Sequence, residues 1–261
     1  MAVYLAYSDE TSQGTHLSQF YRTGFVAPRS DWDDWFVPAW QERVLQGPPS
    51  IPYLHMTEMR SPRFRAAHRL SGIESERRID EAFRVATSMG SLVPIGNSMN
   101  AGHLRNIFRE FRVVTQASKQ RSYSDMEPDY LSFIVFVLTV LAYVHKKRPE
   151  CDKVDFIVEG SGRITSRLQE FHITMPSGLE HIGSPELIPL LGHLISAGKE
   201  SIPLQAADLL CWYTRRSEAG QLDLIDLKRY KKLATREGFL ADLTDEQLTR
   251  IGNGLSTAQF R

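Results

Sequence analysis

Cysteine is scarce in this sequence. Its two cysteines, Cys151 and Cys211, lie far apart among 261 residues, and no C-x-x-C pattern occurs. So few thiols exclude a disulfide framework and leave no cysteine cluster for a structural zinc site. Cysteine used in this way fits a reducing compartment, so we expect a cytoplasmic protein.

Motifs that bind nucleotides or activate a serine are also missing. The sequence contains no G-x-x-x-x-G-K-[ST] and no G-x-G-x-x-G, which argues against a nucleotide-driven machine and a dinucleotide enzyme. No G-x-S-x-G is present, which argues against a serine hydrolase. No charged-then-apolar signal opens the chain. The long apolar run at 130–144 is shorter than the roughly 20 residues that span a bilayer, and we expect it to form a buried helix.

Net charge is zero, which does not by itself predict a nucleic-acid-binding protein, but the charges are unevenly placed. Residues 60–121 contain 12 Lys or Arg and 5 Asp or Glu, whereas residues 1–59 contain 3 basic and 7 acidic residues. We expect a basic, largely helical insertion at about 60–121. A phosphate-binding surface and a solvated helical face explain its charge equally well.

The pattern of apolar residues predicts a mixed α/β protein. Strands are expected where apolar residues alternate, at 3–7, 18–27, 92–99, 153–162 and 191–198. Helices are expected at 31–45 (interrupted near Pro38), 74–89, 101–112, 128–147 and 203–220. The first two strands form a hairpin in this interpretation. The whole order predicts one domain, 1–261, with a mixed sheet flanked by helices.

Three acidic residues end or interrupt apolar elements. Asp9 follows the apolar run of the first strand, and Glu159 closes the strand "VDFIV" before a glycine. Asp208 interrupts "LQAADLLCW", on a helical stripe that should face the core. Alternation along the first strand places Asp9 on one face and Glu10 on the other.

Burial of an ionised carboxylate costs several kcal/mol unless another charge compensates it. An arginine is one compensator, and a divalent cation held by oxygen ligands from separate elements is another. Carboxylate and water ligands suit Mg²⁺ or Mn²⁺, and no Cys/His cluster points to zinc or copper. From the residues alone, structural ion pairs and a metal site both remain open.

Three segments resemble one protein family. The stretch "YSDET" leading into "FYRTGFVAP" resembles the opening of the domain-of-unknown-function 3800 family. "YLHMTEM" resembles the His-containing segment of that family, and "SIPLQAADLLCWYTRR" resembles its closing helix. The resemblance touches both ends and the middle of the chain.

The family is similar to the ribonuclease H-like superfamily, in which acidic residues on the first strand, the fourth strand and a late helix gather metal ions. The resemblance therefore implies a ribonuclease H-like fold with Asp9, Glu159 and Asp208 as metal ligands. It also implies that Glu10 is an acidic neighbour of the site and that Gln205 matches the family's glutamine.

Three features depart from the family pattern. Thr11 stands where the family usually has serine, no glycine directly follows it, and Glu159 stands where the family often has aspartate. Glu159 is therefore the predicted ligand that matches the family pattern least.

A histidine and an aromatic segment complete the candidate residues. His55 and Glu58 are three residues apart and could share a helical face as ligands or as a base, and the resemblance implies a catalytic or substrate-orienting His55. A histidine in a surface loop is the simpler interpretation. The aromatic residues between Trp32 and Trp40 recur at helical spacing, which predicts core packing, although they could also stack on bases.

These patterns predict a nuclease that hydrolyses phosphodiester bonds in DNA or RNA with a two-metal site of Mg²⁺ or Mn²⁺. Its expected catalytic residues are Asp9, Glu10, Glu159, Asp208 and His55. The family resemblance suggests a mobile-element or defence setting. A non-catalytic module that binds nucleic acid or protein on the same scaffold is the alternative, and convergence of the three carboxylates distinguishes the two hypotheses.

Overall fold

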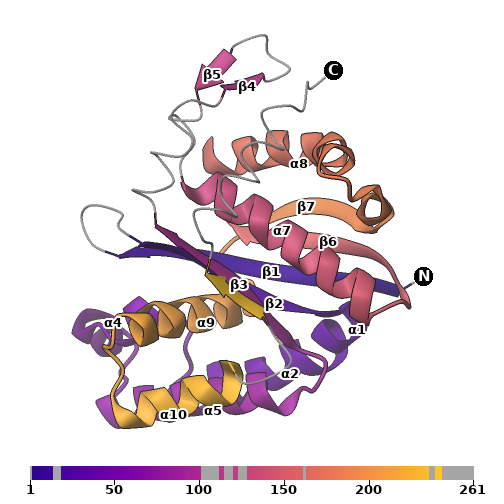
Figure 1. Ribbon diagram of the computed structural model, residues 1–261. Helices are drawn as coiled ribbons and strands as arrows, with labels where there is room; N and C mark the ends of the chain where they lie inside the picture. Colours follow the sequence, from indigo (N-terminus) through magenta and orange to yellow (C-terminus); the bar gives the residue numbers. More distant parts are fainter. Residues whose placement is uncertain are drawn as a thin grey trace.

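In a computed structural model, the chain forms a mixed sheet with helices on both faces (Figure 1). The structure describes residues 2–13, 19–100, 112–114, 120–122, 128–160, 163–234 and 239–242. Within this part of the chain, five strands lie in the order β7-β6-β1-β2-β3, and the short β8 extends the sheet beyond β3. The bounds of the sheet strands are β1 Ala2–Gln13, β2 Gln19–Pro28, β3 Val93–Asn100, β6 Cys151–Glu159, β7 Leu191–Ala197 and β8 Phe239–Asp242.

Strand direction divides the sheet into two parts. β1, β2 and β3 are antiparallel neighbours, whereas β6 pairs parallel to β1 and β7 pairs parallel to β6. The predicted hairpin of β1 and β2 is confirmed, but its first strand does not end near Asp9. Pairing with β2 continues from Asp9–Thr23 to Gln13–Gln19, which keeps β1 extended beyond the predicted strand.

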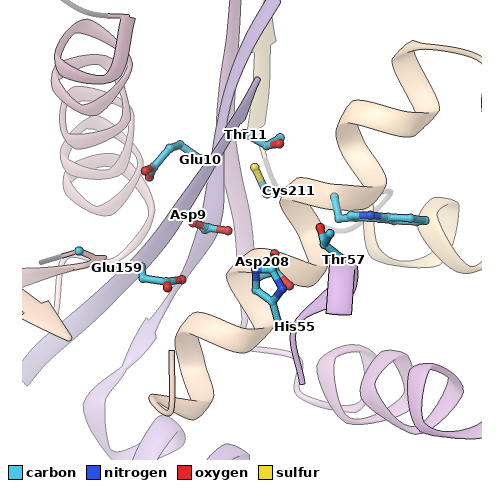
Figure 2. Close-up of a pocket in the computed structure, with 10 residues that line it drawn as sticks. Asp9, Glu10, Thr11, His55, Thr57, Glu159, Asp208 and Cys211 are labelled. Carbon is cyan, nitrogen blue, oxygen red and sulfur yellow. Dashed lines mark ion pairs between the residues drawn. The ribbon is translucent and has the colours of Figure 1, made fainter. Parts of the chain in front are cut away.

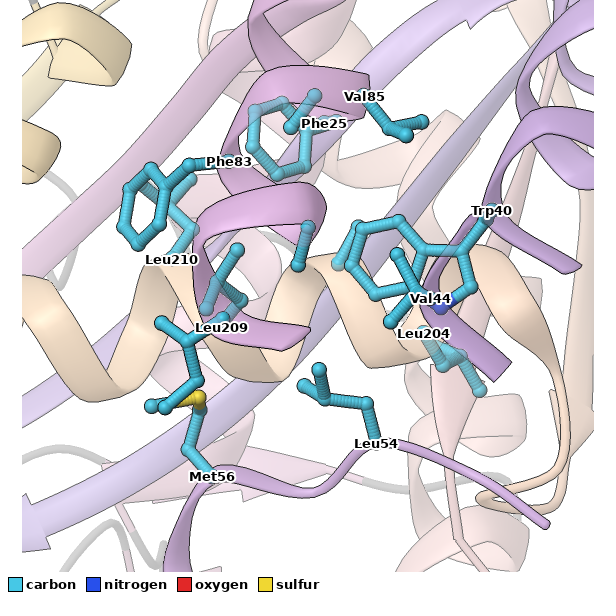
Figure 3. Packing of buried hydrophobic residues seen from close by; sticks show 14 of the residues in the cluster. Phe25, Trp40, Val44, Leu54, Met56, Phe83, Val85, Leu204, Leu209 and Leu210 are labelled. Atoms are coloured by element: carbon cyan, nitrogen blue, oxygen red, sulfur yellow. The ribbon is translucent and has the colours of Figure 1, made fainter. Parts of the chain in front are cut away.

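Each face of the sheet covers its own hydrophobic cluster. On one face, α7 (Pro128–Lys147) and α8 (Arg163–His181) pack over strand residues such as Ala6 and Phe156. On the other face, α9 (Ile202–Glu218) and α5 (Gly72–Ser88) pack over Leu5, Phe25 and Ile157 (Figure 3). Neighbouring residues on one strand therefore belong to different clusters, as the alternation of side chains requires.

The remaining elements are short or lie at the edges of these layers. They are α3 Met56–Met59, α4 Pro62–Ala67, the small hairpin β4 Arg112–Val114 and β5 Gln120–Ser122, the 3₁₀ helix η4 Pro185–Leu190, and α10 Leu224–Ala234.

Residues 29–45 are helical without a break, so the predicted interruption near Pro38 is wrong. The segment alternates between α1 (Arg29–Asp31), the π-helical turn η1 (Trp32–Phe36), α2 (Val37–Trp40) and a second π-helical turn, η2 (Gln41–Leu45). Pro38 follows closely after the π-helical turn η1, so the helix continues through it although its missing N–H removes one backbone hydrogen bond. Trp32, Phe36 and Trp40 are buried in the core, as predicted, whereas Trp35 is 73% exposed.

The predicted basic insertion at about 60–121 is corrected in two respects. This range contains β3, which is a full strand of the central sheet, and α5, which packs against η2 and α10. Arg60 and Arg84 form ion pairs with nearby acids, and the guanidinium group of Arg78 is bonded to backbone carbonyl groups. Part of the basic charge thus stabilises the fold. The helix predicted at 101–112 falls almost entirely outside the described residues.

By length and composition, α7 could cross a membrane. The apolar run at 130–144 alone was too short to predict this, because α7 extends beyond both ends of the run. Most of it, 61% of the apolar window, is buried inside the protein. Contacts with β2 and β3 account for this burial.

Candidate functional site

Asp9 and Glu159 lie next to each other on parallel strands. Tyr7 of β1 pairs with Ile157 of β6, and both carboxylates stand two residues further along their strands. Since side chains alternate, Asp9 and Glu159 occupy the face of the sheet that α9 covers. The regular parallel register therefore places these two acids side by side at one end of β6.

α9 brings a third carboxylate to this position. α9 packs across β1 and β2, and Asp208 on its sheet-facing side is buried. Asp9 and Asp208 are close enough for each to affect the pKa of the other. A pocket of about 350 Å³ opens between the two strands and α9 (Figure 2), and its lining is Asp9, Glu10, Thr11, His55, Thr57, Glu159, Gly160, Asp208, Cys211 and Trp212.

Burial and mutual repulsion disfavour ionised carboxylates in this pocket. Burial raises the pKa of Asp9 well above its usual range, and the charges of Asp208 and Glu10 raise it further. Burial also raises the pKa of Asp208, although His55 and a backbone N–H oppose this effect. The pKa of Glu159 is raised by burial, with a smaller opposing effect of His55. A cation in the pocket would favour the ionised forms.

Glu10 lines the same pocket, but its charge is compensated by an arginine. Arg22 stands opposite Glu10 in the hairpin, and their charged groups are 3.2 Å apart. The Arg22 side chain is only 1% exposed and also bonds to Ser132 of α7 and Ser8 of β1. Glu10 therefore forms a structural ion pair. Among the ion pairs of the described residues, Asp208 has only His55 as a partner, and Asp9 has none.

His55 is held at the pocket by α9. The backbone N–H of Leu54 donates to Gln205 Oε1 at 3.0 Å, and that of Met56 donates to Asp208 Oδ2 at 2.6 Å. These two bonds hold the residues on either side of His55, whose Nε2 lies 3.8 Å from Asp208 Oδ1. His55 Nδ1 is buried without a hydrogen-bond partner among the described residues.

Glu58 does not share the site with His55, contrary to the pairing considered from the sequence. Its carboxylate accepts a hydrogen bond of 2.6 Å from the Tyr53 hydroxyl and lies 3.4 Å from Lys199 Nζ. The short helix α3 begins just after His55, so the two side chains do not follow one helical face.

Gln205 has a structural role that the sequence pattern did not reveal. Its Oε1 accepts hydrogen bonds from Trp40 Nε1 and from Leu54 N–H, both at 3.0 Å. Its Nε2 donates to the carbonyl groups of Lys199 and Glu200. The three-residue spacing of Gln205 and Asp208 could have indicated that both side chains contact one neighbouring segment.

Cys211 and Trp212 also line the pocket, one helical turn beyond Asp208. Burial raises the pKa of the Cys211 thiol well above its usual range, and the nearby charge of Asp9 adds to this effect. Cys211 is therefore a neutral thiol at neutral pH and not a thiolate ligand.

The oxygen donors of the pocket fit a hard divalent cation. Among the residues that the structure describes, no three His, Cys, Asp or Glu side chains already form a compact metal-binding group. Mg²⁺ does not require such a group, because it commonly keeps several waters and binds proteins through one or two carboxylates. Asp9 and Asp208 line one pocket and could supply these carboxylates, and Glu159 supplies a further one at the pocket wall.

No family model, curated protein or solved structure matches this chain. The class that the structure defines is an α/β protein with a mixed sheet, covered by helices on both faces, and an acidic pocket beside its parallel strands.

Proposed function

We propose that this protein is a metal-dependent nuclease of the ribonuclease H-like type, related to the domain-of-unknown-function 3800 family. The observation that carries the proposal is the pocket in which Asp9, Glu159 and Asp208 meet from β1, β6 and α9. The strand order supports the fold assignment: β3, β2 and β1 are antiparallel neighbours, and β6 and β7 continue the sheet parallel to β1.

Asp9 and Asp208 would hold Mg²⁺ or Mn²⁺, with Glu159 at the edge of the same pocket. The ion would supply an activated water and charge stabilisation for displacement at phosphorus. His55 Nε2, beside Asp208 Oδ1, holds or transfers a proton at the wall of the pocket. Glu10 contributes by neutralising Arg22 and leaves the direct ligand positions to Asp9 and Asp208.

The substrate in this proposal is DNA or RNA, and the protein acts in the cytoplasm. Cys151 and Cys211 are both free and buried, which suits a reducing compartment. A polyanionic substrate suits the site because a cation between carboxylates and a phosphodiester compensates the charge of both.

A nuclease assay tests the proposal directly. The purified protein is incubated with single- and double-stranded DNA, RNA and a DNA–RNA hybrid while Mg²⁺ or Mn²⁺ is titrated. We expect metal-dependent cleavage that Asp9→Asn abolishes, because the amide preserves shape and removes the negative charge. The matched control Asp34→Asn changes an exposed aspartate on the helix that contains Trp35, and it should retain full activity.

Absence of cleavage of every substrate, with every metal concentration, would contradict the nuclease proposal. Oligonucleotide binding without cleavage would then favour a non-catalytic binding module on the same scaffold. His55→Gln separates the roles within the site: it should lower kcat by about 10²-fold or more while the metal still binds.

A further inference from the structure

The face of α9 that carries Asp208 continues as a stripe beyond the pocket. Trp212 follows Asp208 by four residues and Arg216 by eight, so the three side chains lie along one side of the helix. At a rise of about 1.5 Å per residue, the Cα atom of Arg216 lies about 12 Å along the axis from that of Asp208. Trp212 lines the pocket, and the Arg216 guanidinium carbon lies 4.7 Å from the centre of its ring.

Arg216 differs from its neighbour Arg60 in its charge environment. Arg60 also stacks on Trp212, at 5.5 Å, but it forms ion pairs with Glu76 and Asp226. Arg216 donates from Nη2 to the Gln221 carbonyl at 3.2 Å, and its Nε is buried without a hydrogen-bond partner. Within the described part of the chain, no acidic side chain pairs with it.

A half-buried guanidinium without a counter-charge favours an anionic ligand. Arginine binds phosphate with a planar set of donors, and an aromatic ring beneath it keeps that plane in place. The carboxylates of the pocket would repel the same ligand, so a cationic contact some distance away would help to hold a polyanion. At about 3.4 Å per stacked nucleotide, a strand that contacts both ends of this stripe spans more than one nucleotide.

We propose that Arg216 anchors a backbone phosphate of a single nucleic-acid strand, a few nucleotides from the phosphodiester bound at Asp9 and Asp208. Trp212 is buried and would support the Arg216 guanidinium from beneath. This inference rests on the proposed function in one respect, namely that the substrate is a nucleic acid. Arg216 is then a substrate-anchoring residue, and it takes no part in bond cleavage.

Fluorescence anisotropy with labelled oligonucleotides tests the inference without requiring cleavage. Binding of a strand of about twelve nucleotides and of a dinucleotide, which has a single phosphodiester, is measured in Ca²⁺ buffer, from about 50 to 200 mM salt. For the longer strand, Arg216→Gln should lower the slope of log Kd against log salt by about 0.7, the value for one phosphate contact on a single strand. For the shorter strand, which cannot reach from the pocket to Arg216, the variant and the wild type should agree.

Two further variants provide the controls. Arg216→Lys keeps the charge and should restore the salt slope, which a purely structural role at the end of α9 would not require. Lys146→Gln removes an exposed charge from α7, on the opposite face of the sheet, and should leave both strands unaffected. Melting temperatures of all variants verify that they fold.

An unchanged slope for Arg216→Gln, an equal change on both strands, or no binding of either strand by the wild type would overturn the inference. If the length-dependent effect is present but no substrate is cleaved with Mg²⁺ or Mn²⁺, the strand-binding inference stands and the nuclease proposal fails. If cleavage occurs and Arg216→Gln has no length-dependent effect, the nuclease proposal stands and the strand-binding inference fails.

Discussion

Asp9 and Glu10 are adjacent residues with different electrostatic environments. Asp9 faces α9, where burial and Asp208 raise its pKa, whereas Glu10 pairs with the buried Arg22. Removal of the charge of Asp9 relieves its repulsion with Asp208. Removal of the charge of Glu10 leaves the buried guanidinium of Arg22 with a weaker partner. The two substitutions should therefore change stability in opposite directions.

Asp9→Asn should stabilise the protein in the absence of metal, and increasingly so as the pH rises. Because the folded-state pKa of Asp9 is raised, the folded protein binds this proton more tightly than the unfolded chain does. The stability that this proton gives to the wild-type fold is fully present at pH values below the ordinary carboxyl range. It is lost as the pH rises through the raised pKa of Asp9. Thermal melts in EDTA between about pH 5 and 8 measure this difference. Asp34→Asn should show no such trend, and an Asp9→Asn protein less stable than wild type at pH 8 would contradict the expectation.

Glu10→Gln should destabilise the fold by about 1 to 3 kcal/mol. Loss of one partner of a buried ion pair costs about 3 to 5 kcal/mol, and the 27% exposure of the Glu10 side chain reduces this value through solvent screening. Asp129, 3.9 Å from Arg22, supplies part of the missing charge. Urea denaturation at neutral pH gives the free energy of unfolding. A change below about 0.5 kcal/mol, typical of surface substitutions, would show that the pair contributes little.

At the scale of elements, the spacing of Gln205 and Asp208 on α9 attaches the segment around His55 to the sheet. Both side chains accept backbone N–H groups from that segment, and Gln205 also accepts Trp40 Nε1–H. The position of His55 thus depends on Gln205, which is not one of the described residues that line the pocket.

Gln205→Ala should cost about 2 to 6 kcal/mol of stability, because two buried donors, Trp40 Nε1–H and Leu54 N–H, lose their acceptor at about 1 to 3 kcal/mol each. Activity should also fall, since the loop that carries His55 loses one of its two attachments. Chemical denaturation measures the first effect and a cleavage assay the second. Gln41→Ala, at an exposed position of η2, is the control and should stay within about 0.5 kcal/mol of wild type.

The sequence predicted most elements because their apolar periods are regular. The stripe of α9 and the alternation along β1 also indicated which face Asp208 and Asp9 would occupy. The extension of β1 past Asp9 depends on pairing with β2, which local pattern does not determine. The continuous helix through Pro38 depends on π-helical turns, and the pairing of Glu10 with Arg22 depends on hairpin register. These features are set by tertiary contacts, so the sequence alone could not specify them.

At the scale of the whole molecule, the pocket lies where the two parts of the sheet meet. β1 belongs to both parts, because it pairs with β2 in the antiparallel part and with β6 in the parallel part. A ligand that joins Asp9 to Asp208 and Glu159 would therefore connect β1, β6 and α9, and global unfolding would have to disrupt it.

Mn²⁺ should raise the melting temperature of the wild-type protein. At a metal concentration about 100 times Kd, binding to the native state alone adds about 2.7 kcal/mol, which corresponds to a rise of about 5 to 10 °C for a chain of this length. The shift should increase with pH, because protons compete for Asp9 and Asp208, whose pKa values are raised. Differential scanning fluorimetry measures it. Asp9→Asn should lose most of the shift, and an equal shift in that variant would place the metal elsewhere.

Hydrogen–deuterium exchange at the two backbone N–H groups that α9 binds can report how often the pocket opens. The amides of Leu54 and Met56 lie outside any strand, yet each is bonded to a buried side chain of α9. Their hydrogens can exchange with deuterium only when this segment separates from α9, so the exchange rate reports how often the pocket opens. Both amides should exchange far more slowly than expected for a residue in the loop before α3 (Leu54) and for the first residue of that short helix (Met56). Gln205→Ala should accelerate exchange at Leu54 before exchange at Met56.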